Sequence, residues 1–245
     1  MTHRFEAQPA YILHARPYQE SSLLLELFTR DFGRIAAIAR GAKRKTKGGN
    51  GVLQPFVPLL VACSGKGELL TLKNFESESI YPMLMARRLM SALYLNELLM
   101  RLLYRWDAHL DLFHFYQTTL RALEHQENEQ VVLRLFEKEL LKAIGYGLQL
   151  TVELDSGQPV QAEQHYLFNS ELGPSLLHEL QMHGSQSKHH GQNIQKLVFK
   201  GKSLLALDTG DLSDPSCLQD AKRLMRESLG KHLGVRPLET RKLFL

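Results

Sequence analysis

The chain has 245 residues, 44% hydrophobic and 23% charged, a composition that excludes a fibrous repeat or an extended disordered chain. Its 30 Lys and Arg residues only slightly exceed its 26 Asp and Glu residues, but the excess is unevenly placed. Residues 1–80 hold 11 basic and 7 acidic side chains, residues 81–195 hold 9 and 13, and residues 196–245 hold 10 and 6. Two basic ends flank an acidic middle, which favours a polyanionic partner.

The two cysteines, Cys63 and Cys217, are too few for a disulfide scaffold or a four-cysteine metal site. The first twenty residues lack the apolar core that is typical of a signal peptide. No run of 18 apolar residues occurs, because charged and polar side chains interrupt the most apolar stretch, residues 84–104. We therefore expect a cytoplasmic protein with reduced thiols and no membrane contact.

The first eighty residues predict short strands separated by turn-forming residues. The first strand is expected to begin at residues 11–13, and the others are expected at residues 22–29, 33–39, 53–63 and 68–75. Five short strands with no long helix between them are typical of a small closed barrel or a sandwich. Between the third and fourth strands, residues 40–51 (RGAKRKTKGGNG) form a basic loop with a glycine-rich exit.

From Pro82 onward, apolar residues recur at helical spacing and predict three helices, the last of which stops at Gly145. Their apolar faces comprise Ala92, Leu95, Leu99, Leu102 and Leu103, then Leu112, Phe115, Tyr116, Leu120 and Leu123, then Val132, Leu135, Phe136, Leu140 and Ala143. Residues 148–195 show no sustained period and are expected to form an irregular insert with room for one short hairpin. A last helix is expected from Asp214 as N-cap, with Pro215 in the first turn, to Gly234.

In the basic loop, five of the eight residues from Arg40 to Lys47 are Lys or Arg, and none is acidic. Each cation at a phosphate releases condensed counterions, so the loop favours sequence-independent binding to nucleic acid. The alternative is a solvated hairpin tip. A barrel with such a loop often binds single strands by stacking bases on aromatic side chains. The candidates are Tyr18, Phe28, Phe32, Phe56 and Phe75, although most of them lie in apolar runs typical of a core.

Two helices carry cations at regular spacing. On the last helix, Lys222, Arg223 and Arg226 lie opposite the apolar face, where a DNA contact and a solvated face are equally good interpretations. On the third helix, Arg134, Lys138 and Lys142 are spaced by four and form a cationic stripe. Glu137 and Glu139 lie close to this stripe, so internal ion pairs are the alternative there.

The sequence predicts no catalytic site, no metal and no cofactor. Asp208-Thr209-Gly210 matches the tripeptide of aspartic proteases, but that chemistry needs two carboxylates that share a proton, and one copy is present. Histidines gather near the insert without the spacing of a zinc ribbon or finger. They are His165, His178, His183, His189 and His190.

Short motifs along nearly the whole chain resemble the RecO family of bacterial DNA repair proteins. They are ILHARPYQESS at residues 12–22, LFT at 27–29, ARGAK at 39–43, LQPF at 53–56, GKGEL at 65–69, LNELL at 95–99, IGYG at 144–147 and RPL at 236–238. Each motif is short, and it is their order and spacing that make the resemblance specific.

The resemblance implies an α+β chain in four parts. An N-terminal OB-fold β-barrel would span residues 1–80, a helical domain 81–147, an irregular insert 148–195, and a C-terminal helical part 196–245 that packs on 81–147. Many members of the family hold zinc in a four-cysteine ribbon within the insert. This chain lacks those cysteines, so no zinc is expected.

The resemblance also implies a non-enzymatic recombination mediator. Such proteins bind single- and double-stranded DNA, anneal complementary strands and, with RecR, help RecA to replace single-strand-binding protein. The expected DNA-binding residues are Arg16, Arg34, Arg40, Lys43, Arg44, Lys45, Lys47, Lys222, Arg223 and Arg226. The acidic, phenylalanine-ended tail of single-strand-binding protein would contact Arg134, Lys138 and Lys142. An RNA-binding OB-fold factor and a hydrolase that uses Asp208 are the alternatives.

Overall fold

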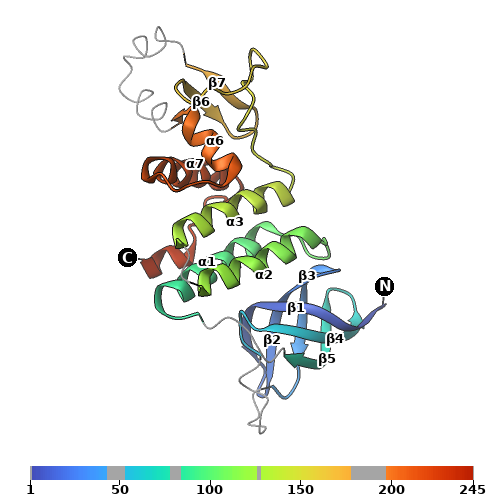
Figure 1. Ribbon diagram of the computed structural model, residues 1–245. Helices are drawn as coiled ribbons and strands as arrows, with labels where there is room; N and C mark the ends of the chain where they lie inside the picture. The colour runs from blue at the N-terminus through green and yellow to red at the C-terminus, as the bar shows by residue number, and fades with distance from the viewer. Residues whose placement is uncertain (1, 43–52, 78–83, 126–127, 178–196, 245) are drawn as a thin grey trace. The chain divides into compact units, whose positions relative to one another are not determined.

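The computed structural model of the chain describes residues 2–42, 53–77, 84–125, 128–177 and 197–244 (Figure 1). These residues form two compact units. The first, which we call the barrel unit, comprises Met1–Glu127 and Arg236–Leu245. The second unit comprises Asn128–Val235. The last fifty residues are therefore divided between the two units.

The barrel unit contains five strands in the order that the sequence predicts, but the first begins at Thr2 rather than Tyr11 and the fourth at Pro58 rather than Leu53. They are β1 (Thr2–Tyr18), β2 (Ser22–Thr29), β3 (Gly33–Ala39), β4 (Pro58–Lys66) and β5 (Leu69–Ser77). They close into a barrel in the order β1-β2-β3-β5-β4, in which all neighbours are antiparallel except β3 and β5. This arrangement agrees with the OB fold.

The barrel core is apolar because alternate residues of each strand point inward. Ile12, Leu25, Leu27, Ile35 and Val61 are fully buried there. Cys63 is also buried among them, and this burial raises the pKa of its thiol to about 12. The thiol therefore stays protonated near neutral pH, as expected for a structural cysteine.

The turn before β3 requires glycine. Gly33 has a φ of +65°, and a Cβ atom there would lie 1.8 Å from the carbonyl oxygen of Asp107. The segment that follows the first helix runs at this edge of the barrel, where the Trp106 amide donates to the Arg34 carbonyl at 3.0 Å. The close approach of two backbones thus fixes residue 33 as glycine.

Helices α1 (Ala86–Leu102) and α2 (Leu110–Glu124) cover part of the outer surface of β1 and β2 (Figure 1). Asn96, which is 2% exposed, donates to the Leu13 carbonyl at 2.9 Å and accepts from the Tyr116 hydroxyl at 2.5 Å. Phe28 points out of the barrel and packs against Phe113, with ring centroids 5.4 Å apart. Two helices and two strands therefore share one buried layer.

In its described residues, the second unit joins three helices to a small sheet. Its elements are α3 (Glu129–Ala143), β6 (His165–Asn169), β7 (Gly173–Leu176), β8 (Val198–Lys200), α6 (Gly201–Thr209) and α7 (Pro215–Leu233). Helix α7 packs against α3 and α6. Its N-cap Asp214 accepts from the Ser216 amide at 2.8 Å, and Pro215 occupies the first turn, as predicted.

The insert is more regular than its sequence suggests. Strands β6 and β7 form an antiparallel hairpin, and β8, just beyond the expected insert, pairs with the other edge of β6. Tyr166, Phe168 and Phe199 are buried on this sheet. The short hairpin expected in the insert is therefore present, but the third strand was not expected, because strands of three to five residues are too short to show a period. Residues 178–196 lie outside the described range.

Among the helices of the described residues, none combines the length and the apolar composition needed to cross a bilayer. The final short 3-10 helix, η1 (Glu239–Phe244), belongs to the barrel unit and contacts α1.

Candidate nucleic-acid interface

The outer face of β1, β2 and β3 presents an exposed cation beside apolar side chains. Arg16 pairs in register with Leu24, and Leu24 with Ile38. These three residues alternate with core residues and therefore point outward. Arg16 is exposed, whereas Leu24 and Ile38 are partly exposed. We call this row the outer barrel face.

The basic loop begins at the same end of the barrel. Arg40 lies two residues after Ile38, is exposed, and has no polar partner among the described residues. Lys43, Arg44, Lys45 and Lys47 lie outside the described residues, so the structure does not test the contacts predicted for them. The most basic segment of the chain thus begins at the end of the barrel that also carries Arg16.

Arg34 lies at the other end of β3 and is not the exposed cation that we expected. Its side chain is 16% exposed, and its Nη1 lies 3.6 Å from the Glu26 carboxylate. Burial lowers the pKa of the Arg34 guanidinium, an effect that Glu26 opposes and Arg105 reinforces. Arg105, which the sequence did not single out, donates to the same carboxylate. Glu26 therefore forms ion pairs with both Arg34 and Arg105 within the barrel unit.

Most of the candidate stacking aromatics belong to the core, as their apolar surroundings suggest. Phe28 and Phe56 are buried, and Phe32 stacks on Phe5 with centroids 4.5 Å apart. Phe75 packs against the barrel core. Only Tyr18 of the candidate set stays outside these core contacts, at the tip of the β1–β2 hairpin.

The cations of α7 divide into two groups. Lys222 and Arg226 are exposed, one helical turn apart, with no polar partner among the described residues. Arg223 instead donates to the Val198 carbonyl at 2.6 Å and to Asp220 at 2.9 Å, and its guanidinium lies 4.2 Å from the Phe199 ring centroid. Arg223 therefore ties α7 to β8, whereas Lys222 and Arg226 face solvent.

The cations of α3 do not form a continuous exposed stripe. The Arg134 side chain is 7% exposed and donates to Glu137 at 2.7 Å. The Lys138 ammonium donates to the carbonyls of Leu207 and Asp208 at the end of α6, at 3.0 and 2.7 Å. Lys142 is 72% exposed and lies 3.6 Å from Glu139. The internal pairing that the sequence left open is thus realised for Arg134 and Lys142.

The hydrolase alternative gains no support. Asp208 is exposed on the last turn of α6, and Gly210 ends that helix with a φ of +83°. Within the described ranges, no three His, Cys, Asp or Glu side chains come together as a metal site. Of the candidate histidines, His165 alone is described, as an exposed residue of β6.

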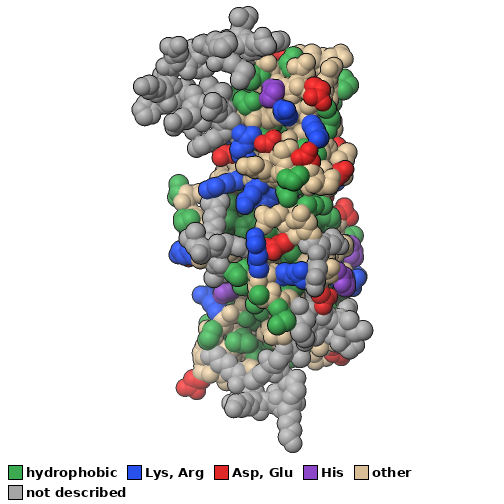
Figure 2. Space-filling model, turned by 60° about the vertical axis from the view of Figure 1, so that its left-hand side comes forward, with side chains coloured by type: hydrophobic (Ala, Val, Ile, Leu, Met, Phe, Trp, Pro, Cys, Tyr) green, Lys and Arg blue, Asp and Glu red, His purple; other side chains and the backbone are tan. Residues whose placement is uncertain are grey.

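On the face drawn in Figure 2, Lys and Arg side chains are interspersed with Asp and Glu side chains. Positive charge on that face is therefore mixed rather than gathered into a single field.

Two protein-family models together match almost the entire chain. "Recombination protein O N terminal" matches residues 1–81, and "Recombination protein O C terminal" matches residues 85–242. The first match coincides with the barrel strands and the second begins just before α1.

Curated relatives named "DNA repair protein RecO" match over nearly their whole length. The relative from Nitrosococcus oceani is 42% identical over 98% of this chain and 93% of its own. The relative from Alkalilimnicola ehrlichii is 43% identical, covering 98% and 91%, and that from Coxiella burnetii (strain RSA 331) is 40% identical, covering 99% of both. The resemblance noted from short motifs is confirmed, and the chain belongs to the RecO family of DNA repair and recombination proteins.

Proposed function

We propose that the chain binds single- and double-stranded DNA, anneals complementary strands and acts as a recombination mediator without catalysing a reaction of its own. With RecR, it would promote the loading of RecA on DNA coated with single-strand-binding protein. Membership of the RecO family supports this proposal. The observation that carries it is the pair of exposed arginines, Arg16 and Arg40, on an OB-type barrel at the entrance to the basic loop.

On this proposal, the outer barrel face and the basic loop hold the DNA backbone. Arg16, Arg40 and the loop cations would neutralise phosphates regardless of sequence. Leu24 and Ile38 would offer an apolar surface to sugars or bases of an unpaired strand. Annealing requires that the repulsion between two strands be screened, and the many cations of one loop supply such screening.

The exposed pair Lys222 and Arg226 on α7 is proposed as a second DNA contact. Arg223 supports that pair by fixing α7 to β8 rather than by touching DNA. Of the residues proposed for the tail of single-strand-binding protein, Lys142 has the exposed ammonium that could meet its carboxylates.

Charge reversal of the loop tests the proposal. The triple variant Lys43→Glu, Arg44→Glu and Lys45→Glu should bind DNA more weakly, and the log–log salt slope should fall by about 0.7–1 unit per lost contact. Strand annealing in the presence of single-strand-binding protein should slow in parallel. The double variant Lys222→Glu and Arg226→Glu should also bind DNA more weakly if α7 provides the second DNA contact. Unchanged affinity and slope in the triple variant would contradict the loop assignment.

The same binding and annealing assays with RNA of identical sequence distinguish a DNA mediator from the main alternative, an RNA-binding factor. A DNA mediator should anneal DNA in the presence of single-strand-binding protein. A factor dedicated to RNA should bind and anneal the RNA more tightly and faster than the DNA.

A further inference from the structure

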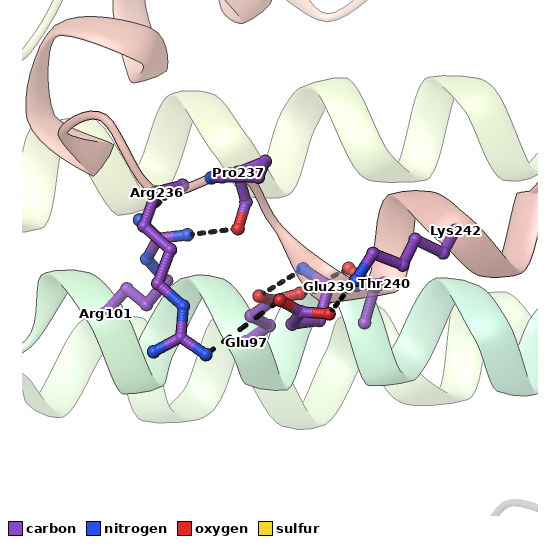
Figure 3. A network of polar contacts seen from close by, with 7 residues as sticks. All are labelled: Glu97, Arg101, Arg236, Pro237, Glu239, Thr240 and Lys242. Atoms are coloured by element: carbon purple, nitrogen blue, oxygen red, sulfur yellow. Dashed lines mark hydrogen bonds and ion pairs between the residues drawn. The ribbon is translucent and has the colours of Figure 1, made fainter.

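The last residues of the chain dock on α1 within the barrel unit, although the residues just before them belong to the second unit. We call residues 236–244 the C-terminal strap. Leu238 is 2% exposed and anchors the strap by its apolar side chain. The strap ends in η1, whose first turn faces α1 (Figure 3).

Glu97 of α1 caps the first turn of η1. Its Oε1 accepts from the Glu239 amide at 2.7 Å, and its Oε2 accepts from the Thr240 amide at 2.9 Å and the Thr240 hydroxyl at 2.6 Å (Figure 3). Amides at the start of a helical turn have no partner within that turn, so a carboxylate is well suited to them. The cap comes from a residue 142 positions away.

Arg101 holds the other end of the strap. It lies one turn after Glu97 on the same face of α1. Its Nη2 donates to the Arg236 carbonyl at 2.6 Å and its Nη1 to the Pro237 carbonyl at 3.1 Å. A planar guanidinium can bind two successive carbonyls in this way, whereas an ammonium binds as a single point.

The residues that lead into the strap have little packing of their own. Gly234 has a φ of +68°, and apart from its neighbours along the chain no atom lies within 4 Å of a Cβ built there. Val235 is fully exposed. The position of the strap therefore depends on its own contacts with α1.

We propose that the C-terminal strap is a latch that restrains the second unit. The chain leaves the barrel unit before Asn128 and returns to it at Arg236, so the second unit is joined to it at both ends. While the strap is docked, the returning connection is held on α1 by Glu97 and Arg101. When the strap leaves Glu97 and Arg101, the second unit is held to the barrel unit by the connection before α3 and no longer by the docked strap. This latch is independent of the DNA-binding proposal.

Hydrogen exchange on the full-length protein tests the docking. In Glu97→Ala, protection of the Glu239 and Thr240 amides should fall at least tenfold. Alanine is a good helix former, so α1 should keep its fold, and the Leu103 amide, which donates to Leu99, reports on that. Glu239 and Thr240 amides that are unprotected in the parent protein, or equally protected in the variant, would overturn the proposal.

Spin labels on the two units test the restraint. Lys73→Cys on β5 and Leu172→Cys in the β6–β7 turn are exposed sites, while the native Cys63 and Cys217 are buried. The combined change Glu97→Ala and Arg101→Ala should broaden the distribution of distances between the labels at least twofold. Lys231→Ala removes an exposed ion pair with Glu171 and should leave the distribution unchanged. A distribution that keeps its width in the double variant would refute the latch.

Discussion

The barrel unit and the second unit differ in how many of their predicted binding cations are held by internal partners. In the barrel unit Arg34 alone of the described ones is held in this way, whereas in the second unit Lys222 and Arg226 are exposed and three others are held. In the barrel unit, Arg16 and Arg40 are exposed and have no polar partner within the described part of the chain. In the second unit, Arg134, Lys138 and Arg223 each bind groups of their own unit. A regular spacing of cations along a helix therefore does not establish a binding surface. Burial and internal partners decide whether a cation is available to a ligand.

The largest expected effect is the loss of the buried ion pair on α3. Arg134→Ala removes the cation that lies 2.7 Å from the Glu137 carboxylate, whose side chain is 1% exposed. We expect the free energy of unfolding to fall by about 3 kcal/mol, because a buried charge is costly without its counterion. Urea denaturation measures this change. The double variant Arg134→Met and Glu137→Leu should recover most of the loss.

Lys142→Ala is the matched control on the same helix. Its exposed pair with Glu139 should contribute less than about 1 kcal/mol to stability. The same variant should bind an acidic peptide ending in Phe more weakly if Lys142 meets the tail of single-strand-binding protein. If Arg134→Ala proved as stable as Lys142→Ala and lost more peptide affinity, the assignments of the two residues would be reversed.

A second comparison is between Arg34 and Arg16 of the barrel unit, in their effects on stability and on DNA binding. Arg34→Ala should lower the free energy of unfolding by about 1–3 kcal/mol, because Arg34 faces Glu26 in a mostly buried site. Arg16→Glu should leave stability nearly unchanged and weaken DNA binding by about 1.5 kcal/mol, roughly tenfold. Lys73→Glu, an exposed reversal on β5, is the control for charge alone. Equal losses of DNA affinity in Arg16→Glu and Lys73→Glu would argue against a specific outer barrel face.

Local signals in the sequence were sufficient for many elements. The Asp214 cap, Pro215 and the glycine after Leu233 predict α7, because each acts through the backbone of its own neighbours. The turn before Gly33 was found in the same way, although its close contact with Asp107 was not. The fold class followed from five short strands, and the OB assignment came from the family resemblance.

Contacts between distant residues could not be predicted in this way. The spacing of Arg134, Lys138 and Lys142 predicts that they share one side of α3. It does not predict which groups of the fold contact that side. Arg105 and Glu26 meet across 79 positions, and Glu97 reaches Glu239 across 142. Such pairs depend on how the elements pack, which no local pattern encodes.

The last prediction concerns the turn that follows Glu153 in the second unit. The Glu153 carboxylate accepts hydrogen bonds from the Ser156 amide at 2.8 Å and the Leu176 amide at 3.3 Å, and also from the Ser156 hydroxyl. These hydrogen bonds, that of the Ser156 hydroxyl above all, lower the pKa of Glu153 from 4.5 to about 2. A lowered pKa means that the carboxylate stabilises the turn fully above about pH 4.5, and that this stabilisation is lost as the pH falls toward 2.

Hydrogen exchange between pH 6 and 2, corrected for the intrinsic rate, measures this loss. Protection of the Ser156 and Leu176 amides should fall with pH, while the Trp106 amide at the barrel edge keeps its protection longer. Glu153→Gln should weaken the same amides at pH 6 and remove most of the pH dependence. A chelator should change nothing, because the carboxylate holds these amides directly. If protection at Ser156 instead fell on adding chelator at constant pH, the turn would depend on a metal, and the hydrogen bonds of Glu153 would be insufficient to hold it.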